Sequence, residues 1–251
     1  MNCFHRNIDS GVLEIKRILG QIRKAAQDYN MIKDGDRIAV GVSGGKDSLT
    51  LLVALKMLQS FYPCKFELEA VTLTMGIGEF NLDPVRELCG KIDVNYTIEE
   101  TLIGKIVFEA RQEKNPCSLC ANLRRGALHN VAKALGCNKV ALAHHKDDVI
   151  ETFLLSTFYE GRLHTFSPVT YLERKALYLI RPLIYTEEKE IKGFVKARGL
   201  AIVPSPCPAN GKTKREDIKS LLTEMSKGKK DIKNNIFGAI RRSGIDGCPP
   251  V

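Results

Sequence analysis

The chain has 251 residues, which is enough for one large domain or for one domain with an appendage. Lys and Arg number 38 against 29 Asp and Glu, so the net charge is +9, and 44% of residues are hydrophobic. This usage excludes disordered, collagen-like, coiled-coil and mucin-like chains. No apolar run approaches the ~18 residues of a membrane helix, and the first residues lack the apolar core of a signal peptide. We therefore expect a soluble, cytoplasmic protein that binds no membrane.

The positive charge is concentrated near the C-terminus. From Lys212 onward there are ten Lys or Arg residues and five Asp or Glu residues. A basic face is the usual footprint of a polyanionic partner such as a nucleic acid, although a solvated helix face has the same composition.

Hydrophobic periodicity predicts strands and helices in alternation. A helix over 12–30 comes first, and Asp34-Gly35-Asp36 reads as a turn before the first strand. Predicted strands cover 37–42, 66–73, 94–98, 139–143, 177–180 and 200–203. Predicted helices cover 47–61, 83–90, 118–135, 148–159 and 186–198. This alternation predicts a doubly wound α/β fold with a mostly parallel sheet and ligands at the carboxyl ends of its strands.

Three regions follow from this reading. An N-terminal helix occupies 1–34, the α/β domain occupies 35–208, and a basic helical segment occupies 209–251. The Pro-rich stretch at 204–208 marks the end of the regular domain.

A glycine-rich loop lies between the first strand and its helix. It reads Ser43-Gly44-Gly45-Lys46-Asp47-Ser48. Glycines allow a tight turn and a close approach to an anion, and the N–H groups of a helix start favour phosphate. Lys46 adds a point charge. The loop is neither the G-x-x-x-x-G-K-[ST] phosphate loop nor G-x-G-x-x-G.

Cys117 and Cys120 form a C-x-x-C pair at the start of a predicted helix. One such pair fits a redox couple, half of a zinc site or half of an iron–sulfur site. The chain has no second C-x-x-C, which disfavours a four-cysteine zinc site. Cys207, after the last predicted strand, is the plausible third partner. Three thiolates are able to hold a four-iron cluster with one iron left open.

The loop SGGKDS resembles the pyrophosphate loop of the N-type ATP pyrophosphatases. Further motifs narrow the resemblance: CSLC running into LRRGAL, then LAHHKDD, FYEG, IRPL and a late Cys. Together they resemble the tRNA 2-thiocytidine synthetase family. The likeness extends from about Lys33 to Pro208.

This resemblance implies an ATP-dependent tRNA sulfurtransferase that uses Mg²⁺ and a [4Fe-4S] cluster. ATP would adenylate the C2 carbonyl of an anticodon-loop cytidine, and sulfide bound at the open iron would then displace AMP. A cysteine desulfurase or a sulfur carrier would supply the sulfur to this tRNA-binding enzyme. A homodimer is one candidate assembly.

The resemblance also assigns residues. Main chain near Leu73 would meet adenine, Arg124 would stabilise developing negative charge, and Asp148 would serve as acid, base or Mg²⁺ ligand. Asp147 is a candidate helix N-cap. The ATP phosphates are assigned to Ser43, Gly44, Gly45, Lys46, Asp47 and Ser48, and the cluster to Cys117, Cys120 and Cys207.

Other functions stay open at this point. The loop at 74–82 departs from the family pattern, which leaves the accepting nucleoside open. A 2-thiouridine-type thiolase is one alternative, although its relatives carry zinc fingers that this chain lacks. A second is an ATP-dependent amide or amine ligase with structural cysteines, and a third is a non-enzymatic RNA-binding module.

Overall fold

The computed structural model describes residues 3–111, 116–207, 214–228 and 231–247. Its sheet has the strand order β3-β2-β1-β4-β6-β5. All neighbouring strands are parallel except β5 and β6, which confirms the mostly parallel α/β fold. The strands are β1 (Asp36–Gly41), β2 (Phe66–Leu73), β3 (Asn95–Glu99), β4 (Lys139–Ala141), β5 (Val169–Leu172) and β6 (Leu177–Ile180).

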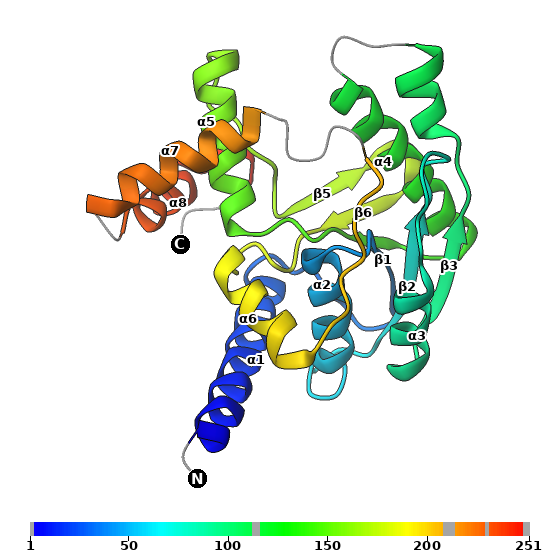
Figure 1. The fold of residues 1–251 in the computed structure, drawn as a ribbon, viewed down its shortest axis with the longest axis horizontal. Coiled ribbons are helices and arrows are strands. Elements are labelled where there is room, and N and C mark those ends of the chain that lie inside the picture. The colour runs from blue at the N-terminus through cyan, green and yellow to red at the C-terminus, as the bar shows by residue number, and fades with distance from the viewer. Residues whose placement is uncertain (1–2, 112–115, 208–213, 229–230, 248–251) are drawn as a thin grey trace.

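Helices cover both faces of this sheet (Figure 1). Side chains alternate along β1, so Ile38 and Val40 pack with α1, α2 and α6, whereas Ala39 packs with α4 on the opposite face. The helices are α1 (Cys3–Asp28), α2 (Lys46–Leu58), α3 (Asp83–Lys91), the π-helix Lys105–Ala110, α4 (Pro116–Ala134), α5 (Lys146–Glu160), α6 (Glu188–Arg198), α7 (Lys214–Gly228) and α8 (Ile232–Ser243). No described helix is long and apolar enough to cross a membrane.

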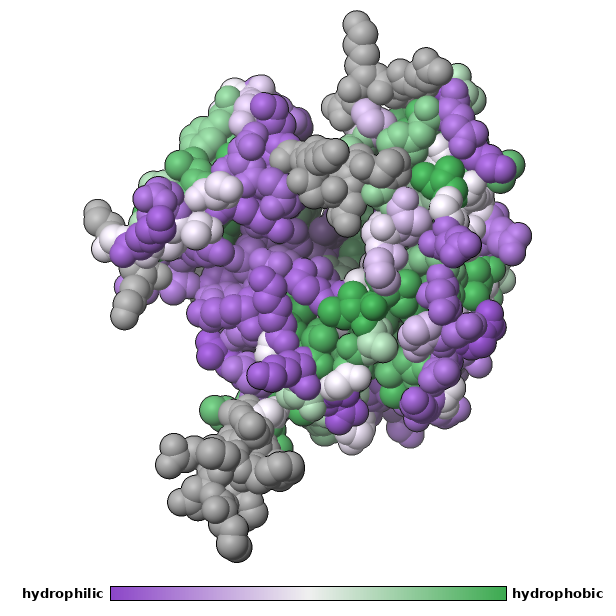
Figure 2. Space-filling model, viewed as in Figure 1, coloured by the Kyte–Doolittle hydropathy of each residue, from purple (hydrophilic) through white to green (hydrophobic). Residues whose placement is uncertain are grey.

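The C-terminal helices α7 and α8 pack against α5 and each other. Ile218, Leu222, Phe237 and Ile240 are buried there. Hydrophilic side chains predominate on this side of the molecule, with a smaller hydrophobic patch at the upper left of Figure 2. The predicted boundary at 208/209 lies outside the described residues.

The predicted last strand at 200–203 was wrong. This segment is irregular and crosses in front of the sheet (Figure 1), with Val203 N donating to Gly44 O at 2.9 Å. Pro204 and Pro206 lack N–H groups, so the chain cannot continue a strand ladder there. The edge strand β5, the π-helix Lys105–Ala110 and the short 3₁₀ helix Glu173–Lys175 were not predicted.

Candidate functional site

The glycine-rich loop lies at the carboxyl end of β1 and leads into α2. Ser48 is buried and braces the loop, since its hydroxyl accepts from Ser43 N at 3.1 Å and donates to Gly45 O at 3.0 Å. Gly45 is the N-cap of α2 and makes no side-chain cap. The first N–H groups of α2 therefore have no side-chain acceptor, and they form an anion site of the kind found at helix N-termini.

Gly44 has the left-handed backbone angle φ +77°, which favours glycine. A Cβ at this position would lie 2.9 Å from the Cβ of Val203. The segment after α6 is thus packed directly onto the loop, and the same segment carries Cys207 four residues later. This contact fixes the third cysteine relative to the loop.

Lys46 is held by two carboxylates. Its Nζ lies 3.0 Å from Asp47 and 3.1 Å from Glu188. Although burial works in the opposite direction, these carboxylates raise the pKa of Lys46, so the side chain stays cationic. Asp47 Oδ1 is buried without a hydrogen bond, and His145 Nε2 lies 3.6 Å from it.

A cavity of about 420 Å³ joins the loop to the cysteines. Leu73 and Arg124, two of the residues assigned from the sequence, lie on its wall. The described lining residues are Ser43, Gly45, Lys46, Asp47, Leu73, Met75, Phe80, Cys120, Arg124, Ile202, Val203, Pro204, Ser205, Pro206 and Cys207. Gly44 and Ser48 are not among the described lining residues, and Ser48 instead supports the loop through its hydrogen bonds.

The three predicted cysteines approach one another. Cys117 and Cys120 are one turn apart at the start of α4, where Cys117 is exposed and Cys120 is buried. Burial raises the pKa of the Cys120 thiol, and the nearby thiols of Cys207 and Cys117 act in the same direction. Cys207 is half-buried, and no disulfide joins these three thiols.

The donor set is three free thiols, and soft sulfur ligands of this kind suit an iron–sulfur cluster. Among the described residues, no three His, Cys, Asp or Glu side chains are close enough together to hold one metal ion. The sulfurs that ligate a four-iron cluster are spread around its core, so they lie farther apart than ligands of one ion. Soft thiolates from α4 and from the segment before 208 fit such a group.

Asp148 is the third residue of α5 and contacts two groups. Its Oδ2 accepts from His145 N at 3.0 Å, which caps the helix start, and its Oδ1 lies 3.3 Å from Arg215. Arg215 also contacts the buried Glu151 at 3.0 Å and Thr152 at 3.1 Å. Burial raises the pKa of Glu151, against the effect of Arg215.

Asp147 does not cap its own helix. The N-cap of α5 is His145, and Asp147 Oδ2 instead accepts from Glu188 N at the start of α6 at 2.8 Å. Its Oδ1 accepts from Lys233 of α8 at 2.5 Å. Asp147 therefore connects α5 to α6 and α8 by hydrogen bonds. The local sequence around Asp147 does not indicate these long-range contacts.

A second cavity of about 560 Å³ adjoins the first, and Ser43, Leu73 and Arg124 line both. The remaining residues of its wall include several that sequence reasoning did not assign to the site: Arg125, Thr152, Phe166, Arg181 and Arg215. Arg125 and Arg181 lie inside the quoted motifs LRRGAL and IRPL, which offered a signal for them. Phe166 and Arg215 stand in no such motif.

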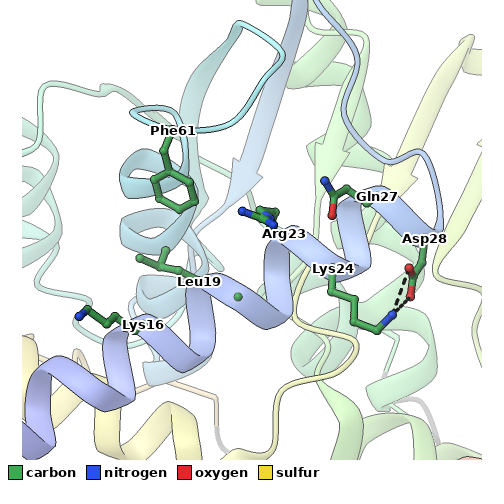
Figure 3. A pocket seen from close by; sticks show the side chains of 8 residues that line it. Lys16, Leu19, Arg23, Lys24, Gln27, Asp28 and Phe61 are labelled. Atoms are coloured by element: carbon green, nitrogen blue, oxygen red, sulfur yellow. Dashed lines mark hydrogen bonds and ion pairs between the residues drawn. The ribbon is translucent and has the colours of Figure 1, made fainter.

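A larger cavity of about 700 Å³ lies elsewhere, along α1 (Figure 3). Lys16, Leu19 and Arg23 line it together with Phe61 from the turn after α2, and an ion pair joins Lys24 to Asp28 at 3.0 Å. None of the predicted site residues lines this groove.

Comparison with known proteins identifies the family. The family profile described as the PP-loop domain matches residues 15–225. A tRNA-cytidine(32) 2-sulfurtransferase of Pelobacter propionicus is 40% identical over 228 residues, which are 90% of this chain and 85% of that protein. The chain belongs to the tRNA-cytidine(32) 2-sulfurtransferase family. The member from Geobacter sulfurreducens is 39% identical over 91% of this chain and 90% of its own.

A solved structure supports the fold of this family member. The U34-tRNA thiolase NcsA from Methanococcus maripaludis, described with its [4Fe-4S] cluster, matches with a TM-score of 0.76 and 23% identity. The match covers 93% of this chain and 79% of that one. The NH3-dependent NAD synthetase of Campylobacter jejuni matches less closely, with a TM-score of 0.50 and 18% identity over 92% of this chain and 91% of its own. The resemblance stated from the motifs is thereby confirmed at the level of family and fold.

Proposed function

We propose that this chain is an ATP-dependent tRNA sulfurtransferase that replaces the C2 oxygen of cytidine 32 with sulfur. One observation carries the proposal: a single cavity is lined by the phosphate loop on one side and by Cys120 and Cys207 on the other. An adenylated base and a sulfur nucleophile need such a common space, because they must meet before water reaches the activated carbon.

The loop supplies the ATP half of this site. Backbone N–H groups at the start of α2 and the cationic Lys46 bind the phosphates, and main chain near Leu73 meets adenine. Asp47 fits a Mg²⁺ ion bound together with the phosphates, because its buried Oδ1 lacks a hydrogen-bond donor. Mg²⁺ would neutralise charge on the departing pyrophosphate.

The cysteines supply the sulfur half. Cys117, Cys120 and Cys207 would hold a [4Fe-4S] cluster, and their number leaves one iron without a protein thiolate. When bound, this group supplies sulfide next to the activated base. Arg124 is on the cysteine helix α4 and lines both cavities, so it would stabilise the negative charge that develops in the reaction.

The chemistry balances in two steps. Cytidine O2 attacks the α-phosphorus of ATP, and pyrophosphate leaves. Sulfide then adds to C2, and AMP departs with the original oxygen. Asp148 is held by Arg215 and the His145 main chain and lies outside the described lining of both cavities, so in this proposal it positions Arg215 and transfers no proton.

The sulfur comes from a cysteine desulfurase, directly or through a carrier, in this proposal. The enzyme acts in the cytoplasm, where tRNA, ATP and reduced thiols are found together. A homodimer remains a candidate assembly.

The test is in vitro thiolation of unmodified tRNA by the anaerobically reconstituted protein, followed by mass spectrometry of nucleosides. We expect 2-thiocytidine to form with ATP, and Cys207→Ser to abolish it while ATP–pyrophosphate exchange on tRNA continues. Cys64→Ser is the matched control, because Cys64 is also half-buried but lies outside the cavity. A 2-thiouridine product would instead favour the alternative that the enzyme is a 2-thiouridine-type thiolase. Full 2-thiocytidine formation by Cys207→Ser would contradict the role of Cys207 in holding the cluster. ATP consumption on tRNA by the wild type without any thiolated nucleoside would favour an amide or amine ligase.

A further inference from the structure

The second cavity is lined by more positive than negative charge, although one of its arginines, Arg215, is paired with Asp148 and Glu151 outside the described lining. Four arginines line it, from α4, β6 and its following turn, and α7: Arg124, Arg125, Arg181 and Arg215. No carboxylate stands among its described lining residues. Its charge therefore complements an anionic ligand, and its volume of about 560 Å³ is within the usual range of ligand pockets, roughly 300–1,000 Å³.

One wall of this cavity is a layer of flat groups. The Arg181 guanidinium lies 5.0 Å from the ring centroid of Phe166, and the His144 ring lies 4.7 Å from the same centroid. Arg181 Nε also donates to His144 Nδ1 at 3.3 Å. Arg181, His144 and Phe166 therefore lie close to one another. Phe166 also packs against the core, which supports this layer from behind.

The layer is fixed in position and in charge. Arg181 is 7% exposed and also donates to Ser167 O at 2.5 Å. Burial, and after it the charge of Arg181, lowers the pKa of His144 to about 4, so its ring is neutral near pH 7 and accepts the hydrogen bond at Nδ1. The guanidinium and the imidazole are thus two flat groups held in place on the wall of the cavity.

Two arginines reach the cavity from outside this layer. Arg125 is exposed on α4, where its side chain contacts Asn122 of the preceding turn. Arg215 comes from the first turn of α7 and is 34% exposed. Both are accessible to phosphate groups that continue beyond the pocket.

We propose that this cavity holds the target nucleotide flipped out of the tRNA loop, with its base stacked on the Arg181–His144 layer and its flanking phosphates bound by Arg125 and Arg215. The inference rests on the proposed function and adds the residues that bind the RNA. Enzymes that modify a base remove it from its stack, and RNA bases stack on aromatic rings and guanidinium planes. A small anion alone would not use a flat wall, and an apolar ligand would not match four arginines.

Geometry also places the base next to the reagents. Ser43, Leu73 and Arg124 belong to both cavities, so a base on the layer faces the ATP phosphates and the thiols across these residues. In this arrangement the C-terminal helices contribute a residue to the reaction site, since Arg215 belongs to α7.

The first experiment measures flipping directly. An anticodon stem-loop RNA carries 2-aminopurine beside the target cytidine, and its fluorescence rises when the neighbouring base leaves the stack. We expect the rise with wild-type protein and its loss with Arg181→Lys, which keeps the charge and removes the plane. Phe166→Leu removes the supporting ring and is the second variant. Both should raise the KM for tRNA by roughly 5- to 140-fold, the range expected for one stacked base. Both should leave ATP binding by calorimetry unchanged, which also verifies that they fold.

The second experiment identifies the phosphate contacts. Arg125→Gln and Arg215→Gln should each reduce the slope of log K against log salt for stem-loop binding by about 0.7–0.9. Lys16→Gln and Arg23→Gln, in the separate groove along α1, are controls that should leave this slope unchanged.

The outcomes separate the two proposals. If wild-type protein thiolates tRNA but Arg181→Lys and Phe166→Leu keep its KM and its fluorescence rise, the base-stacking inference is wrong and the proposed function stands. If wild-type protein flips the base but forms no thiolated nucleoside, the proposed function is wrong and the pocket stands. Unchanged salt slopes in both Gln variants would contradict the phosphate contacts.

Discussion

Gly44→Ala should damage the structure at the point where the phosphate loop meets the segment that carries Cys207. Gly44 has φ +77°, and a Cβ there would lie 2.9 Å from the Cβ of Val203. A non-glycine residue in the left-handed region costs roughly 1–2 kcal/mol. Forcing an extra carbon into a packed contact costs about 1–3 kcal/mol more. The free energy of unfolding should therefore fall by about 2–5 kcal/mol.

Urea unfolding of Gly44→Ala, Gly45→Ala and the wild type measures this loss. Gly45 has φ −77°, and its added Cβ would meet only Ser43 Oγ at 3.4 Å, so this control should lose less than about 1 kcal/mol. Val203→Gly removes the opposing Cβ. The double variant with Gly44→Ala should therefore lose about 1–3 kcal/mol less than the sum of the single variants. Equal stability of the two alanine variants, or strict additivity in the cycle, would refute the proposed packing.

Three further predictions concern charged groups around the site. Burial acts to raise the pKa of Glu188, but Lys46 outweighs it and lowers this pKa from 4.5 to about 2. The free energy of unfolding should therefore decrease as the pH drops from about 4.5 to about 2, and it should decrease less in Glu188→Gln. Asp147→Ala should cost roughly 2–4 kcal/mol in urea unfolding, less than a fully buried pair because Lys233 is 39% exposed. Lys46→Met should weaken ATP binding by roughly 10- to 150-fold in calorimetry. A free energy of unfolding that does not change with pH in this range would contradict the first prediction. An unchanged urea midpoint of Asp147→Ala would contradict the second, and an unchanged ATP affinity of Lys46→Met would contradict the third.

Local patterns predicted most of the fold. The buried run at Arg37–Val42 and the glycine turn after it are short-range signals, and β1 and α2 lie where these signals indicated. The segment at 200–203 has strand-like composition, but it pairs with no strand: Leu200 N donates to Val195 O of α6, and Val203 N donates to Gly44 O of the loop. Strand β5 was missed because its pairing with β6 uses a turn without glycine, in which Ala176 adopts φ +46°. Such pairing depends on the partner rather than on local propensity.

The candidate site also has residues that local sequence predicts and residues that it does not. Contiguous motifs predicted the loop residues and the cysteines, because each motif is a short run with its own chemistry. Arg215 reaches Asp148 across 67 residues of sequence, and Phe166 contacts His144 only through the folded chain. Asp147 had a local signal for capping, yet its carboxylate accepts from the start of a helix 41 residues later. Long-range contacts of this kind leave no periodic trace in the sequence.

The central claim is that the phosphate loop and the cysteines face one shared cavity. The most direct test is alkylation of the cluster-free protein by iodoacetamide, with the rate at each cysteine followed by peptide mass spectrometry. Saturating ATP should slow the labelling of Cys120 and Cys207 and leave Cys64 unaffected, because only the first two line the nucleotide cavity. Unchanged labelling of Cys207 in the presence of bound ATP would contradict the account.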